Sequence, residues 1–307
     1  MFEAVLIAGP TASGKSAAAL ALADRLGGRI INADSMQVYR ELPVLTAQPS
    51  AADMAVIPHR LYSTVSGREA YSVGRWVADA AAEIKDARSA GQVPILVGGS
   101  GLYFMALLQG LSPIPDIPED VRQHWRGRAA TISASELHSA LAVRDPIMAE
   151  RLTPTDTQRL VRALEVVEAT GISLAEWQET AGDPVLGAQD LHKLVVAPER
   201  EEIYSAIHAR IDSLLRDGAL AEVEALINLS LDPGLPVMRA LGVPEHAAHL
   251  AGEVDLKDAS NTAKTMSRRY AKRQMTWARR FMADWTWFPS GKAAALAALP
   301  TQQTDQP

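Results

Sequence analysis

The sequence predicts an α/β fold in which a parallel-sheet core carries an inserted, mostly helical domain. Three observations support this class. A phosphate-loop pattern stands between an apolar strand and a helix near the N-terminus, buried strands recur at 29–34, 92–97 and 191–197, and the segment between the last two strands is helical after a proline-rich break. We therefore expect a P-loop NTPase-like core over residues 1–113 and 190–290, a helical insertion at 114–189, and a disordered tail at 291–307.

Length and composition limit the class of protein. A chain of 307 residues can form one large domain and a smaller one. The hydrophobic share of 48% and the charged share of 21% are typical of a globular protein, and the absence of cysteine excludes disulfides and zinc fingers of the cysteine type. No apolar run approaches the roughly 20 residues that span a bilayer, and the first strand begins by residue 3. We expect a cytoplasmic monomer with no membrane segment.

The first strand and helix, at 3–8 and 16–26, enclose the phosphate-binding pattern. The pattern reads Gly9-Pro10-Thr11-Ala12-Ser13-Gly14-Lys15-Ser16. Its glycines allow backbone N–H groups to point at phosphate oxygens, Lys15 adds a positive charge, and the Ser16 hydroxyl can bind Mg²⁺. The pattern predicts that the loop binds a diphosphate or triphosphate without saying which one.

The second and third strands each run into a polar segment. Asp34-Ser35-Met36-Gln37 follows the second strand, and Gly98-Gly99-Ser100 follows the third. Because the carboxyl ends of parallel strands meet at one edge, Asp34 and Ser100 could both face the phosphate site. Asp34 could also simply cap the next turn, and the glycines could form an ordinary turn. The third strand lacks the terminal Asp of a hydrolytic motor, which argues against a force-generating ATPase.

Basic residues recur on two predicted helices. In the insertion, Arg159 and Arg162 lie three residues apart and can share one helix face, either as a solvated face or as a binding face. Near the C-terminus, residues 267–281 form a helix with three stripes. We expect one stripe (Tyr270, Gln274, Trp277, Phe281) to face the core, and the other two (Arg269, Arg273, Arg280 and Arg268, Lys272, Arg279) to be basic. A basic helix on a chain of net charge −6 indicates a polyanion such as RNA, with a membrane surface as the alternative.

These segments, taken in order, resemble the bacterial tRNA dimethylallyltransferase family. The motifs are Gly9–Ser16, Asp34-Ser35-x-Gln37-x-Tyr39-Arg40, Gly98-Gly99-Ser100-Gly101-Leu102-Tyr103, Gln158-Arg159-x-x-Arg162-Ala-Leu-Glu165 and Tyr270-Ala-Lys272-Arg273-Gln274-x-Thr276-Trp277. The resemblance implies that dimethylallyl diphosphate enters a channel from one side. It also implies that the adenosine 3′-adjacent to the anticodon of a tRNA is flipped in from the other side.

The resemblance also implies roles for individual residues. Asp34 would accept a hydrogen bond or proton from the adenosine amine beside Ser100. Lys15, Arg210 and Mg²⁺ on Ser16 would stabilise the departing diphosphate. The positions that would contact tRNA are Asp34, Ser35, Met36, Gln37, Ser100, Arg122, Gln158, Arg159, Leu160, Val161 and Arg162, with Arg269, Lys272 and Arg273 of the basic helix.

The sequence departs from the family pattern at three places. Ser100 replaces a usual Thr, Gln48 replaces a common Lys, and Glu41-Leu-Pro-Val-Leu45 replaces a glycine-containing stretch. Three other functions stay open at this point. They are a P-loop kinase of small molecules, a prenyltransferase of free adenine nucleotides, and a nucleotide-gated RNA-binding protein.

Overall fold

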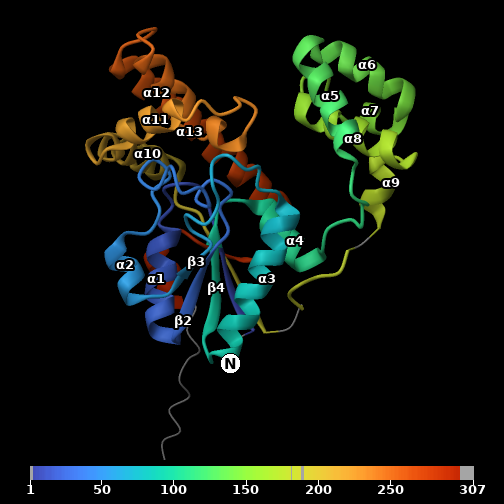
Figure 1. Ribbon diagram of the computed structural model, residues 1–307. Coiled ribbons are helices and arrows are strands. Elements are labelled where there is room, and N and C mark those ends of the chain that lie inside the picture. Colours follow the sequence, from blue (N-terminus) through green and yellow to red (C-terminus); the bar gives the residue numbers. More distant parts are fainter. Residues whose placement is uncertain (1–2, 181, 188–189, 298–307) are drawn as a thin grey trace, which may run out of the picture. The chain divides into compact units, whose positions relative to one another are not determined.

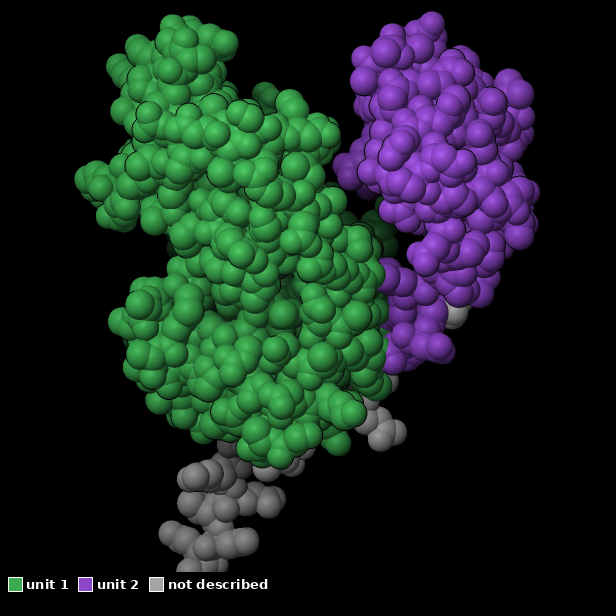
Figure 2. Space-filling view, viewed as in Figure 1, with its two compact units in different colours: residues 1–108, 185–307 green, residues 109–184 purple. Residues whose placement is uncertain are grey.

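The computed structural model describes residues 3–180, 182–187 and 190–297 (Figure 1). The chain divides into two compact units, each with its own core: unit 1 comprises Met1–Leu108 and Val185–Pro307, and unit 2 comprises Gln109–Pro184 (Figure 2). The helical unit therefore begins and ends five residues earlier than the expected insertion at 114–189. None of the helices in the described ranges is both long and apolar enough to cross a membrane.

Unit 1 is built on a six-stranded sheet in which every described pairing is parallel, in the order β3-β2-β4-β1-β5-β6. The strands are β1 (Ala4–Ala8), β2 (Gly28–Asn32), β3 (His59–Arg60), β4 (Val93–Gly98), β5 (Leu191–Val196) and β6 (Thr286–Phe288). The predicted fold class is confirmed. The sequence predicted β1, β2, β4 and β5, which are apolar runs, but missed β3 and β6, because strands of two and three residues carry no periodicity.

Helices cover both faces of this sheet. On one face, α3 (Val73–Ser89) and α4 (Gly101–Gln109) pack Trp76, Ile84 and Phe104 against the strands. On the other face, α1 (Lys15–Leu26) packs Ala18 and Leu22. The remaining helical elements of unit 1 are α2 (Ala51–Val56), α10 (Arg200–Arg216), α11 (Ala219–Asn228), the short 3₁₀ helix η1 (Pro236–Arg239), α12 (Val243–Leu250), α13 (Leu256–Phe281) and α14 (Gly291–Ala297).

The start of the expected disordered tail is ordered. Helix α14 buries Ala294 and Ala295 in the same cluster as α1, so the expectation of disorder is wrong for residues 291–297. A Cβ on Gly291 would lie 2.3 Å from the carbonyl oxygen of Gly14, which means that the backbones of α14 and the phosphate loop touch. Small side chains allow that close contact, and the same alanines made the segment appear featureless in the sequence. Residues 298–307 lie outside the described residues.

Unit 2 is helical throughout its described elements. It contains α5 (Glu119–Thr131), α6 (Ala134–Arg144), α7 (Pro146–Arg151), α8 (Thr157–Thr170) and α9 (Leu174–Glu179) around a core centred on Trp125. Asp145 joins two of these helices. Its buried carboxylate accepts hydrogen bonds from Met148 N (3.0 Å), Ser173 Oγ (2.8 Å) and Leu174 N (3.2 Å), which caps α7 and α9 at once.

Candidate active site

The phosphate loop joins β1 to α1 and ends at the N-terminus of that helix. Gly14, at the N-cap of α1, has φ of +85°, a conformation that a residue with a Cβ rarely adopts. Lys15 Nζ donates to the carbonyl of Pro10 at 3.1 Å, so the ammonium folds back over the loop. The buried Ser13 Oγ has no hydrogen-bond partner among the described residues. The loop therefore presents a cation and an unsatisfied hydroxyl at the positive end of a helix, as an anion site requires.

Lys15 carries a strongly perturbed charge. Burial lowers the pKa of its ammonium from 10.5 to about 8; the negative charge of Asp34 opposes that shift, and the positive charge of Arg210 adds to it. Burial also lowers the pKa of Arg210, against the same effect of Asp34. One carboxylate thus faces two partly desolvated cations. A diphosphate entering this space would supply the negative charge that the cations lack.

The strand-end residues Asp34 and Ser100 are brought together, as the sequence predicted. The Asp34 carboxylate accepts from Met36 N at 3.0 Å, and the Ser100 hydroxyl accepts from Ser35 N at 3.0 Å, so both side chains hold the same turn. The capping role considered for Asp34 is therefore real, but it uses only Oδ1. Within the described ranges no donor reaches Oδ2, which leaves one carboxylate oxygen available for chemistry.

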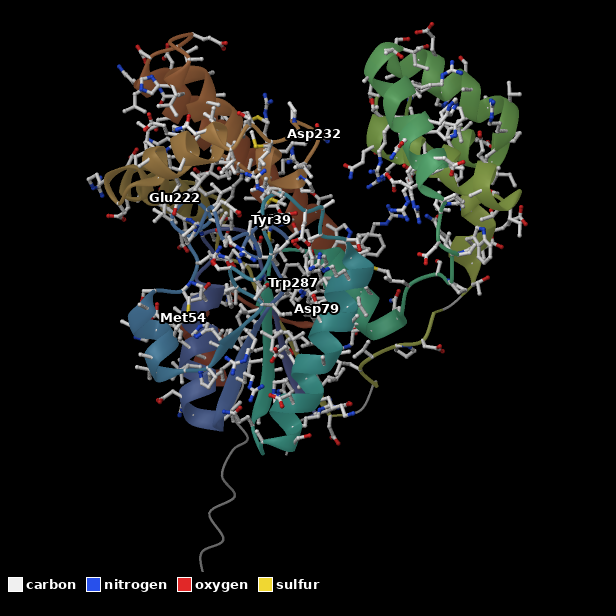
Figure 3. All side chains as sticks on the ribbon, in the orientation of Figure 1. Tyr39, Met54, Asp79, Glu222, Asp232 and Trp287 are labelled. Atoms are coloured by element: carbon white, nitrogen blue, oxygen red, sulfur yellow. The ribbon has the colours of Figure 1, made fainter. Side chains whose placement is uncertain are left out.

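Arg210 is held in place through the loop at 44–47. Its Nη2 donates to the carbonyl oxygen of Thr46 at 2.9 Å, and Gln37 Nε2 donates to the same oxygen at 3.0 Å. Glu222 of α11 (labelled in Figure 3) accepts from Val44 N at 2.7 Å and from Leu45 N at 2.8 Å. Burial raises the pKa of the Glu222 carboxyl. The carboxylate therefore fixes the loop whose path the sequence left in doubt.

Gln48 and Glu41, two other positions that depart from the family pattern, form hydrogen bonds with neighbouring loops. Gln48 Nε2 donates to the carbonyl of Tyr39 at 2.9 Å, and Gln48 Oε1 accepts from Ser63 Oγ at 2.7 Å. Glu41 accepts from Gly67 N at 2.8 Å. Gln48 and Glu41 thus stabilise loops beside the site.

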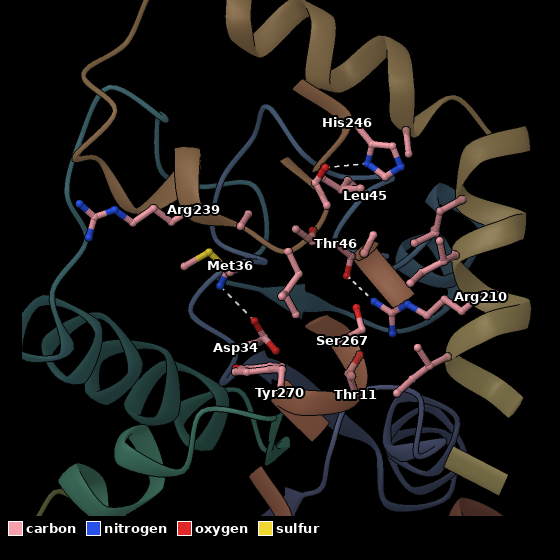
Figure 4. A pocket seen from close by; sticks show the side chains of 18 of the residues that line it. Thr11, Asp34, Met36, Leu45, Thr46, Arg210, Arg239, His246, Ser267 and Tyr270 are labelled. Atoms are coloured by element: carbon pink, nitrogen blue, oxygen red, sulfur yellow. Dashed lines mark hydrogen bonds between the residues drawn. The ribbon is translucent and has the colours of Figure 1, made fainter. Parts of the chain in front are cut away.

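A pocket of about 290 Å³ opens beside these groups, and Asp34 and Arg210 point into it from different sides (Figure 4). Its polar lining includes Thr11, Asp34, Ser35, Arg210, Arg239, His246, Tyr270 and Arg273. Its apolar lining includes Leu45, Ile207, Ile211, Leu214, Leu215 and Ala240. Burial, reinforced by the Asp34 charge, raises the pKa of the Tyr270 phenol, which therefore stays protonated. The pocket therefore offers both charged and apolar side chains to one ligand.

Sequence analysis assigned no role to Gln274, yet this residue ties the site together. Its Oε1 accepts from Thr11 N at 2.9 Å and its Nε2 donates to the carbonyl of Gly99 at 3.0 Å, which links the phosphate loop to the loop after β4. The signals in the sequence were its polar character inside an otherwise aromatic stripe and its place in the motif that runs from Tyr270 to Trp277.

The expectation that the aromatic stripe of the basic helix faces the core is right for Trp277, which packs against the main core cluster, and wrong for Phe281, which is exposed. The buried face of α13 consists of small residues, Ala259, Ser260, Ala263, Ser267, Ala271 and Ala278. Phe281 is 40% exposed, while Tyr270, Gln274 and Trp277 are half-buried around the site. Small side chains let α13 approach its neighbours closely, and that packing outweighs the burial of large rings at the helix edge.

The basic candidates fall into two groups. Arg269, Lys272 and Arg273 are exposed on α13 in unit 1. Arg122, Gln158, Arg159, Leu160, Val161 and Arg162 belong to unit 2. There, Arg159 pairs with Asp156 (3.3 Å) and Arg162 with Glu165 (3.6 Å).

Two of the residues in unit 2 that were predicted to contact tRNA already interact within the protein. Leu160 is fully buried in the unit 2 core, so its side chain is unavailable to RNA. Arg122 Nε donates to the carbonyl of Ile117 at 3.1 Å, which leaves its terminal nitrogens for other partners.

The fold and the site define a class: a P-loop protein that binds an anionic group and an apolar group in one pocket beside a carboxylate, as a group-transfer enzyme with a phosphorylated donor would. The model of the IPP transferase family matches residues 37–281. The chain belongs to this family, and the resemblance seen in the sequence is confirmed.

Relatives agree over nearly the whole chain. A tRNA dimethylallyltransferase of Methylocella silvestris is 51% identical over 296 residues, covering 96% of this chain and 98% of the relative. One of Rhodopseudomonas palustris is 52% identical over 292 residues, covering 95% and 92%. These relatives are enzymes by name, so the chain is an enzyme of the prenyltransferase type.

Solved structures of tRNA prenyltransferases are also similar to this chain over most of its length. The full-length tRNA isopentenylpyrophosphate transferase of Bacillus halodurans is 34% identical with a TM-score of 0.66, covering 94% of this chain and 90% of that one. A eukaryotic dimethylallyltransferase acting on tRNA is 27% identical with a TM-score of 0.77, covering 93% and 73%.

Proposed function

We propose that the protein transfers a dimethylallyl group from dimethylallyl diphosphate to the exocyclic amine of the adenosine 3′-adjacent to the anticodon of tRNA. The observation that carries this proposal is the pocket, whose lining combines Asp34, Arg210 and Thr11 of the phosphate loop with apolar side chains. Membership of the IPP transferase family supports it. The donor's diphosphate suits the cations near the phosphate loop, and its five-carbon chain suits the apolar side chains.

The chemical step is a displacement at the first carbon of the prenyl group. The lone pair of the adenosine amine forms the new N–C bond, the C–O bond to diphosphate breaks, and its electron pair leaves with the diphosphate. The amine must also lose a proton, and Asp34 Oδ2 is the acceptor that has no other partner in the described ranges. The Ser100 hydroxyl accepts one hydrogen bond from Ser35 N, and its own proton stays free to donate to the entering base.

The leaving diphosphate would be held by Lys15, Arg210 and the loop backbone. Both side chains are half-buried and their charges are partly desolvated before substrate arrives, so they can stabilise the developing anion with little reorganisation. The donors also fit Mg²⁺: the Ser16 hydroxyl is exposed in the first turn of α1, beside the phosphate loop. A bound Mg²⁺ would neutralise phosphate charge.

The tRNA would be bound outside the pocket. Ser35, Met36 and Gln37 lie on the turn beside Asp34, where a flipped base would arrive, and Arg269, Lys272 and Arg273 would bind phosphates. Gln37 has already donated its amide to Thr46 and Ala47, so its carbonyl oxygen is the group left for RNA. In unit 2, Arg122, Gln158, Arg159 and Arg162 would add further RNA contacts. We place the reaction in the cytoplasm and expect the enzyme to act as a monomer.

Two alternatives make different demands on the site. A small-molecule kinase would have no use for the apolar side chains that line the pocket together with Asp34, and a prenyltransferase of free adenine nucleotides would not need the exposed basic face of α13. The basic face favours an RNA acceptor.

Mass spectrometry of tRNA incubated with the purified protein, Mg²⁺ and dimethylallyl diphosphate tests the proposal. We expect one added C₅H₈ unit on the adenosine next to the anticodon, formed at least about 100-fold more slowly by the Asp34→Asn variant. Prenylation of free AMP but not of tRNA would favour the nucleotide enzyme. Phosphate transfer from ATP with intact dimethylallyl diphosphate would favour the kinase.

A further inference from the structure

An exposed apolar cluster lies where the active-site loop meets α13. Leu102 is 55% exposed in the first turn of α4, directly after the loop that carries Ser100, and Phe281 is 40% exposed at the last residue of α13. Trp277 lies one helical turn before Phe281 and is half-buried. Large apolar side chains at a rim of the site are costly to leave in water without a function, because each loses the burial that it would have in the core.

The cluster is continuous with the site. A Cβ on Gly101 would lie 2.2 Å from the ring of Trp277, so the loop backbone and the indole are in direct contact and only glycine fits there. The rings of Trp277 and Phe281 are 4.7 Å apart with an interplanar angle of 37°. A path of touching groups therefore runs from Ser100 to Phe281.

The surroundings of the cluster are positively charged. Arg280 lies over the Phe281 ring with its guanidinium carbon 5.0 Å from the centroid, and Arg273, Arg279 and Arg280 are exposed on the same helix. Aromatic faces set among flexible cations are the chemistry that single-stranded nucleic acids select, because bases stack on the rings and phosphates pair with the cations.

We propose that Phe281, supported by Trp277, is a stacking platform for the unpaired base next to the target adenosine. This rests on the proposed function. Flipping the target base removes a stacking partner from each neighbouring base, and the Phe281 ring, which is connected to Ser100 through Gly101 and Trp277, replaces one of them. The path from Ser100 through Gly101 and Trp277 to Phe281 joins the two positions, and Arg280 lies where the phosphate that follows the stacked base would pass.

The test uses an anticodon stem-loop RNA with 2-aminopurine at either position that flanks the target adenosine. Binding of the wild-type protein should quench the fluorescence at one of the two positions, whereas Phe281→Ala should leave it bright and Phe281→Trp should restore the quenching. Loss of one stacked base should weaken RNA binding about 5- to 150-fold. The salt dependence should stay that of the wild type, while Arg280→Gln should lower its log–log slope by about 0.7.

Val56→Ala is the matched control, since Val56 is 73% exposed on α2 and far from this helix in sequence. Unchanged diphosphate binding and melting temperature in Phe281→Ala show that the variant is folded.

Equal quenching by wild type and Phe281→Ala would overturn the platform, even where the wild type prenylates tRNA normally. Loss of binding to anionic phosphatidylglycerol vesicles with unchanged RNA quenching would instead assign the cluster to a membrane surface. A wild type that quenches the probe but does not prenylate tRNA would overturn the proposed function and leave the platform standing.

Discussion

Lys15 in the phosphate loop and the arginines of α13 are both cations proposed to meet phosphate, but their surroundings are opposite. Burial lowers the pKa of Lys15 to about 8, and its ammonium is fixed on the carbonyl of Pro10. Arg269, Arg279 and Arg280 project into solvent from a helix whose buried face is made of small residues. Water and salt screen the arginines, whereas they reach Lys15 poorly.

The difference in burial indicates that Lys15 and the arginines of α13 have different roles. A buried, oriented cation stabilises one diphosphate strongly and is suited to a transition state. Exposed cations bind many phosphates weakly, fix a large polyanion and release counterions. Four of the five predictions below test one side of this comparison, and the fifth tests the carboxylate that faces the buried cations.

Lys15→Ala should have the largest effect. It removes a preorganised charge at the leaving group, which costs on the order of 3 kcal/mol in the transition state, or more than about 100-fold in turnover. Single-turnover prenylation rates measure this, and tRNA binding should be unchanged. Wild-type kinetics in this variant would show that Lys15 has no catalytic role. The proposed difference between Lys15 and the exposed arginines of α13 would then be wrong.

Asp34→Asn should reduce prenylation by at least about 100-fold, because the amide loses the basicity of the free Oδ2. The Met36 N–H keeps an acceptor, since Asn caps about as well as Asp, so the melting temperature should stay close to that of the wild type. Near-normal turnover would leave Asp34 as a cap only. The variant also removes the charge that supports Lys15, so the pKa of the Lys15 ammonium should fall further.

Replacing Arg269, Arg279 and Arg280, which are exposed on α13 and do not line the pocket, by Gln should act only on tRNA. Each lost phosphate contact lowers the log–log salt slope of binding by about 0.7 to 0.9, so the triple variant should lose about 2 to 3 units. Filter binding at several salt concentrations measures the slope. Diphosphate affinity should not change, and an unchanged slope would show that α13 does not face RNA.

Glu222→Gln tests whether buried cations need positioning that exposed ones do not. An amide cannot accept both Val44 N and Leu45 N as the carboxylate does, so the Thr46 carbonyl and Arg210 should lose their fixed place. We expect about a tenfold fall in turnover. Adding Glu222→Gln to an Arg210→Gln variant should cost little more; if the two effects multiply, Glu222 does not act through Arg210.

The sequence predicted one side of the comparison better than the other. The phosphate loop, Asp34 and Ser100 were predictable because a local motif and the ends of parallel strands fix their places. The Glu222 contact was not, since 178 residues separate it from Val44 and no pattern links them. The orientation of α13 was misread because its aromatic stripe suggested a core face, while the helix packs through small residues such as Ala263 and Ala271.

The smallest expected effect is on the pH dependence of donor binding, which should change above pH 8, whereas tRNA binding should not. Because the folded pKa of Lys15 lies below the value of 10.5, the unfolded chain binds more protons between about pH 8 and 10.5, and this group makes the fold more stable as pH rises through that window.

Bound diphosphate favours the charged form of the Lys15 ammonium, so binding of the donor must take up a proton above pH 8. The donor is already ionised there, since phosphate groups titrate near a pKa of about 6. Its dissociation constant should therefore rise up to about tenfold per pH unit above 8 in titration calorimetry, and buffers of different ionisation enthalpy should reveal the proton taken up. Lys15→Met should bind weakly at every pH with no such rise. Binding of tRNA should stay flat over the same range, because the exposed arginines keep their charge. A flat dissociation constant for the donor in the wild type would mean that Lys15 is as solvated as the arginines of α13.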